Sequence, residues 1–138
     1  MRATIALVAV AVGVSLLAGA APAGAHHAFA ATFDTSKPIV VHGVISKVEL
    51  INPHSWFWLD VKNPDGSMTS WMVEGGSPNA LLRRGFNKNS LLPGTEIYVE
   101  AFQAKDGTNR ANGQSLTLAD GKKLFLGSSG ENAPDAGK

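Results

Sequence analysis

Two adjacent histidines, His26 and His27, follow directly after the small residues Ala23-Gly24-Ala25. Small residues in this A-x-A pattern mark the point at which a secretion signal is cut. A cut after Ala25 makes His26 the first residue, so its α-amino group and its imidazole can close one chelate ring on a metal ion. The amine has a pKa of only about 8, so its deprotonation for coordination is easy. The sequence therefore predicts a metal site at the new amino terminus.

The third nitrogen of such a site has two candidate sources. His54 lies in the turn NPHS at residues 52–55, between two expected strands. His27 offers a competing mode through the amine, its own backbone nitrogen and its imidazole. His42 lies within an expected strand, and we interpret it as a residue of the domain wall. Amine and imidazole ligands in a tetragonal arrangement favour Cu(II), so copper is the expected metal and zinc the second choice.

A simpler interpretation involves no metal. His26 and His27 then belong to a lead-in segment, and His54 bonds to the backbone of its turn. The chain has four histidines and no cysteine, which excludes a thiolate centre and covalently attached c-type haem. We find no hydrolase, phosphate-loop or metalloprotease motif, so a binding role is favoured over an enzymatic one.

Residues 1–25 have the organisation of a secretion signal. Arg2 precedes an apolar run at residues 5–18, and Pro22 follows it. The run is shorter than the about 20 residues that a membrane-spanning helix needs, which favours cleavage over an uncleaved anchor. A cut after Ala23 is the alternative, and it would leave further residues ahead of the histidines. We therefore predict a periplasmic or secreted protein with no stable membrane span after cleavage.

The charge balance limits the partners. The whole chain carries 12 Lys and Arg against 11 Asp and Glu, and the predicted signal contains Arg2 and no acid. The remaining chain is formally neutral, so it lacks the basic surface that nucleic acids and anionic membranes require. We expect no nucleic-acid partner. An envelope protein or a small ligand of unknown identity remains as the partner.

The pattern after the signal predicts an all-β domain with one short helix. The expected strands cover residues 39–51, 56–62, 67–74, 96–104 and one or two segments within 114–126. The sequence NPDG at residues 63–66 predicts a tight hairpin turn. Ser77 as N-cap and Pro78 in the first position predict a helix that ends at Gly85. Gly43 marks the place where the long first strand is expected to bulge or bend.

The order β-β-β-α-β-β predicts a small OB-like five-stranded barrel, in which the helix closes one end. A β-sandwich is the alternative, and the single capped helix argues against it. We expect an extended N-terminal segment over residues 26–38, the barrel domain over 39–127, and a disordered tail over 128–138 because of its Gly, Ser, Asn and Pro content.

Three tryptophans, Trp56, Trp58 and Trp71, define a second candidate site. Trp56 and Trp58 share one parity of an expected strand, so both lie on one face. OB folds use exposed aromatic side chains to stack bases and sugars. Such a face predicts a metal-free periplasmic interaction module for a peptide, a glycan or an envelope protein. The alternative is a tryptophan pair that is covered by Phe29 and Phe33 of the N-terminal segment.

Several segments resemble a family of small exported bacterial proteins, domain of unknown function 6152. They are the His-His start after the signal, NPHSW, GSPNALLRRG, LLPGTEIYVEAFQAKDGTNRAN and LADGKKLF, and the resemblance covers about residues 26–127. The resemblance implies export, a single-domain unit and a histidine start that is a feature of the family. It implies no particular activity.

Overall fold

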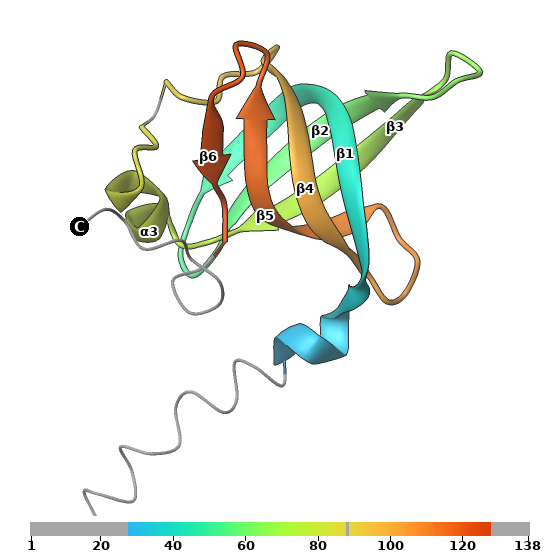
Figure 1. Ribbon diagram of the computed structural model, residues 1–138, viewed down its shortest axis with the longest axis horizontal. Coiled ribbons are helices and arrows are strands. Elements are labelled where there is room, and N and C mark those ends of the chain that lie inside the picture. Colours follow the sequence, from blue (N-terminus) through green and yellow to red (C-terminus); the bar gives the residue numbers. More distant parts are fainter. Residues whose placement is uncertain (1–27, 88, 128–138) are drawn as a thin grey trace, which may run out of the picture. The chain divides into compact units, whose positions relative to one another are not determined.

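The computed structural model describes residues 28–87 and 89–127. The chain divides into two compact units, residues 1–32 and 33–138. In the first unit, residues 28–32 are helical. The elements of the second unit are β1 (Phe33–Leu50), β2 (Ser55–Lys62), β3 (Met68–Gly75), α3 (Pro78–Arg83), β4 (Glu96–Ala104), β5 (Arg110–Leu118) and β6 (Lys123–Phe125) (Figure 1).

The strands form one mostly antiparallel sheet in the order β3-β2-β1-β4-β5-β6 (Figure 1). In addition, residues 72–74 of β3 pair in parallel with residues 110–112 of β5. The first five strands therefore close into a ring in the order β1-β2-β3-β5-β4. The structure confirms the predicted β-rich class, with a short helix between the third and fourth strands.

The long strand β1 connects the two sides of this ring. Its residues 33–44 pair with β4, and residues 44–50 pair with β2. A Cβ added at Gly43 would lie 2.8 Å from the backbone oxygen of Asp60, so only glycine fits where β1 changes neighbours. The irregularity of register was expected at Gly43, and the structure places it between Ile45 and Lys47.

The N-terminal segment differs from the prediction. Residues 26–38 were expected to be an extended lead-in, whereas residues 28–32 are helical and β1 begins at Phe33 instead of residue 39. Phe33 pairs with Ala104 and Pro38 with Phe102, with a shift of register between them. Proline cannot donate a hydrogen bond to a neighbouring strand, so Pro38 was expected to precede the first strand. In the structure, Pro38 lies within β1, next to the irregularity of register.

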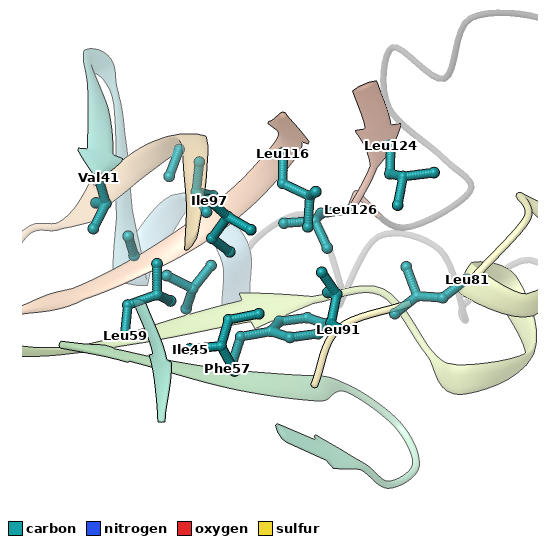
Figure 2. Packing of buried hydrophobic residues seen from close by; sticks show 14 of the residues in the cluster. Val41, Ile45, Phe57, Leu59, Leu81, Leu91, Ile97, Leu116, Leu124 and Leu126 are labelled. Carbon is teal, nitrogen blue, oxygen red and sulfur yellow. The ribbon is translucent and has the colours of Figure 1, made fainter. Parts of the chain in front are cut away.

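The core fills the ring (Figure 2). Phe57 and Leu59 of β2 point inward, as their alternation predicts, and both are fully buried. Burial stabilises each such side chain by about 1.5–3 kcal/mol. The buried cluster comprises Val41, Ile45, Phe57, Leu59, Val73, Leu81, Phe86, Leu91, Ile97, Val99, Ala101, Ala111, Leu116, Leu124 and Leu126.

Two local predictions are confirmed. Ser77 caps α3 by accepting a hydrogen bond from the backbone N–H of Ala80 at 3.3 Å, and Pro78 opens the helix. The hairpin between β2 and β3 closes through residues 63–67, with Gly66 at a φ of 87°. Leu81 then packs α3 onto the core, which explains how so short a helix is stable (Figure 2). Among the described residues, no helix has the length and apolarity that a membrane span requires.

Candidate functional site

His54 lies in the loop between β1 and β2, close to a buried carboxylate. Its Nδ1 is 3.1 Å from Oε1 of Glu74, and the two side chains are 43% and 10% exposed, respectively. A carboxylate oxygen only accepts, so an Nδ1 without a proton would hold its lone pair 3.1 Å from a negatively polarised oxygen. Of the two tautomers of the neutral ring, the one with its proton on Nδ1 is therefore favoured. Nε2 then keeps its lone pair, and it has no partner among the described residues.

The other oxygen of Glu74 is held by Arg110. The NH2 group of Arg110 donates a hydrogen bond of 3.0 Å to Oε2 of Glu74. The guanidinium carbon also lies 5.4 Å from the ring centre of Phe33 and 5.2 Å from that of Trp56, within cation–π range of both. We call these five residues, His54, Glu74, Arg110, Trp56 and Phe33, the His54 cluster.

Strand pairing brings the His54 cluster together. Trp56 on β2 lies directly opposite Glu74 on β3. The parallel pairing of β3 with β5 places Arg110 opposite Met72, two residues before Glu74. Because Phe57 and Val73 point into the core, their neighbours Trp56 and Glu74 point outward. The cluster therefore lies on the outer face of the ring, beside the loops at residues 51–54 and 105–109.

The loop before Arg110 is held by its own side chains. Oδ1 of Asp106 accepts hydrogen bonds from the hydroxyl group of Thr108 at 2.7 Å and from its backbone N–H at 3.0 Å. These two bonds keep the pKa of Asp106 below its usual value. The loop thus gives β5 a defined start at Arg110.

The three candidate tryptophans do not form one surface. Trp56 and Trp58 share the outer face of β2, as predicted, and both are half-buried. Nζ of Lys47 lies 4.6 Å from the ring centre of Trp58, so both rings lie close to a cationic side chain. Trp71 has the opposite parity, lies across from Leu59 and packs against the core.

His42 is on a different part of the ring. Its Nε2 lies 2.8 Å from Oε1 of Glu96, and its ring stacks on Tyr98 with 4.0 Å between the centroids. All three side chains are on the exposed outer face of β1 and β4. His42 is therefore a surface residue whose Nε2 contacts Glu96 and whose ring face is covered by Tyr98.

Several predicted features lie outside the described residues: His26, His27, the signal at residues 1–25 and the tail at 128–138. Within residues 28–87 and 89–127, no group of three or more His, Cys, Asp or Glu side chains is arranged to hold a metal ion. Among the predicted metal ligands, the described part of the chain thus contains His54 alone.

The model of the Family of unknown function (DUF6152) matches residues 12–114. The chain belongs to this family. No curated protein and no solved structure matches the chain. The matched region of this DUF6152 protein includes the positions of every member of the His54 cluster, from Phe33 to Arg110.

Two members of the cluster escaped the sequence analysis. Glu74 reads as one of several scattered acids, and Arg110 reads as a residue of a polar loop. Inward and outward side chains alternate along β2 and β3. This alternation is the sequence signal that could have placed Glu74 on the same face as Trp56. Only the parallel pairing of β3 with β5 shows that Arg110 is the partner of Glu74.

Proposed function

We propose that this protein is an exported, OB-like binding protein that holds one copper ion through His54 and through the amine and imidazole of His26. His27 is the alternative third ligand, and zinc is the second-choice metal. The contact between Nδ1 of His54 and Glu74 carries the proposal, because it leaves Nε2 as the basic nitrogen of a half-exposed imidazole. Imidazoles that bind metals commonly have a carboxylate at the other ring nitrogen.

The position of the His54 cluster supports the OB-like interpretation. The helix α3 stands between β3 and β4, and five strands close into a ring. OB folds bind ligands on the face of the second and third strands and at the loops that join strands one to two and four to five. Trp56 and Glu74 lie on these strands, His54 lies in the first loop, and Arg110 follows the second loop directly.

The length of the segment between His26 and β1 limits where His26 can supply ligands. Phe33 is buried at the start of β1 and belongs to the His54 cluster. Position 26 is seven residues before position 33. An extended segment spans at most about 3.3–3.6 Å per residue, so seven residues reach about 25 Å at most, and less where residues 28–32 are helical. The proposal therefore requires the imidazole of His54 to lie within this distance of the start of β1.

The ligand set favours copper over other divalent ions. An amine and two imidazoles would supply three neutral nitrogen ligands, a donor set that suits Cu(II) at the top of the Irving–Williams series. In the absence of any cysteine, no thiolate competes for the ion. Binding, delivery or sequestration of copper is the proposed role.

Substitution of the two described histidines tests this function. His54→Ala should weaken copper binding by the mature chain at least tenfold in a competition titration, because one of three nitrogen ligands is lost. His42→Ala is the matched control, since His42 also contacts a glutamate but lies on a different part of the ring, between β1 and β4. Equal affinity of the two variants would remove His54 from the site.

A metal-free interaction module is the second candidate function. Leu50 and Ile51, at the end of β1 and in the loop before His54, are 41% and 52% exposed. This exposed apolar pair provides a surface for a peptide, a glycan or an envelope protein. A mature chain that starts at His26 and stays metal-free when copper is added would favour this function.

A further inference from the structure

We propose that Glu74 and Arg110 are positioning residues that hold the imidazole proton of His54 on Nδ1, so that Nε2 is the ligand nitrogen. The metal part of this inference rests on the proposed function. The position of the proton is a property of the metal-free protein, so it can be tested separately from metal binding.

The two oxygens of Glu74 have different partners. Oε2 accepts the hydrogen bond from Arg110, and Oε1 faces Nδ1 of His54. Arginine only donates hydrogen bonds, so its partner Oε2 acts as an acceptor and the orientation of the carboxyl group is fixed. A buried carboxylate requires such partners. Glu74, with its side chain 10% exposed, therefore holds Oε1 3.1 Å from Nδ1 of His54.

Arg110 is itself held in position. The rings of Phe33 and Trp56 both lie within cation–π range of its guanidinium group. Its Nε is buried without a hydrogen-bond partner among the described residues, so the hydrogen bond to Glu74 comes from the end of the side chain. Trp56 lies opposite Glu74 in the register of β2 and β3. The pairing of these two strands therefore positions both the carboxylate and the indole ring that Arg110 contacts.

The pair formed by His42 and Glu96 lacks these features. The two side chains are 48% and 54% exposed, and the contact is made through Nε2. No arginine contacts Glu96 within the part of the chain that the structure describes. This solvent-exposed pair is a matched control for the His54 pair, because a glutamate meets a histidine in both.

The substitution Glu74→Gln should move the proton of His54. Arg110 only donates, so the amide oxygen of glutamine faces Arg110 and the amide NH2 group faces Nδ1. Nδ1 must then accept, and the proton moves to Nε2. The nitrogen that binds the metal is thereby blocked, and copper affinity should fall about 10- to 100-fold, as is typical for loss of such an outer partner.

The experiment is a two-bond 1H–15N correlation spectrum of the metal-free mature protein at about pH 8, where an ordinary imidazole is neutral. We expect the Nδ1–H tautomer of His54 in the wild type and in Glu96→Gln, and the Nε2–H tautomer in Glu74→Gln. An Nε2–H tautomer in the wild type would overturn the inference without any variant. An unchanged Nδ1–H tautomer in Glu74→Gln would overturn it as well.

A copper titration of the same three proteins separates the inference from the proposed function. Weaker binding by Glu74→Gln than by Glu96→Gln supports the positioning role. Equal binding by both variants, with tight binding by the wild type, overturns the positioning role and leaves the proposed function intact. No binding by the wild type overturns the proposed function, and the tautomer of His54 then decides the inference alone.

Discussion

Arg110 and Glu74 are joined by a hydrogen bond of 3.0 Å between two parallel strands, β5 and β3. These strands are the only parallel pair among the described strands. The same pairing closes the ring, so the contact that orients the His54 cluster depends directly on ring closure. The site and the fold are therefore coupled, and substitutions at this pair should affect both.

Arg110→Met should lower the free energy of unfolding by about 1–3 kcal/mol, because the buried Glu74 loses a charge-assisted hydrogen bond. Methionine keeps an unbranched apolar stem for contact with Phe33 and Trp56. Urea unfolding measures the change. The control is Lys123→Met, which breaks the exposed contact of Lys123 with Glu100 at 2.9 Å and should cost about 0–1 kcal/mol. Equal losses in the two variants would contradict a structural role of the Arg110 bond.

Gly43→Ala should destabilise the protein by about 1–3 kcal/mol, as overpacking typically does. The new Cβ would lie 2.8 Å from the backbone oxygen of Asp60. Because this neighbour is a backbone atom and not the end of a flexible side chain, the contact cannot be relieved by a side-chain rotation. Urea unfolding again measures the effect. Thr35→Ala, at an exposed position of the same strand, should change stability by less than about 0.5 kcal/mol. A Gly43 variant as stable as this control would show that β1 and β2 separate easily at this point.

Much of the fold could be predicted from local chemistry. The turn at residues 63–66, the cap at Ser77 and the alternation of Phe57 and Leu59 each depend on a few neighbouring residues, and all are confirmed. The start of β1 could not be predicted, because residues 34–38 include turn-forming side chains. This stretch belongs to the strand because Phe33 and Pro38, at either side of an irregularity, pair with β4.

The candidate site divides in the same way. His54 and Trp56 were identified because their residue types and their loop or strand position are visible in the sequence. Glu74 and Arg110 were missed as a pair because their contact depends on a parallel pairing of segments distant in the chain. A sequence pattern reports neighbours along the strand, whereas this site is made across strands.

Acid should weaken the protein through three similar contacts, each between an aspartate and the Ser or Thr two residues after it. Hydroxyl groups and backbone N–H groups of Ser36, Ser67 and Thr108 donate to Asp34, Asp65 and Asp106, and these bonds lower the pKa of each aspartate. A lowered folded pKa gives stability that is complete above the unfolded pKa of about 4 and is lost as the pH falls through the lower folded value.

The triple substitution Ser36→Ala, Ser67→Ala and Thr108→Ala tests this dependence, because it removes the hydroxyl donors, which are the largest cause of the lowered pKa values. Between about pH 5 and pH 2 the variant should lose less stability than the wild type, measured by urea unfolding at each pH. An identical pH dependence of the two proteins would show that other groups determine acid unfolding.

Tryptophan accessibility separates the two candidate functions. The copper-binding account needs no open aromatic surface, and the structure places Trp58 beside Lys47 and Trp71 against the core. Acrylamide should therefore quench the single-tryptophan variants that retain Trp58 or Trp71 clearly less than it quenches free tryptophan. Quenching of all three tryptophans to the level of the free amino acid would favour the interaction module.

Native mass spectrometry tests the central claim most directly, on protein exported through its own signal and recovered without chelators. One spectrum reports both the position of the cut and any bound metal ion. The account predicts a chain that begins at His26 and carries one copper ion. A chain that begins at Gly24, or one that begins at His26 and stays metal-free after copper is added, would contradict it.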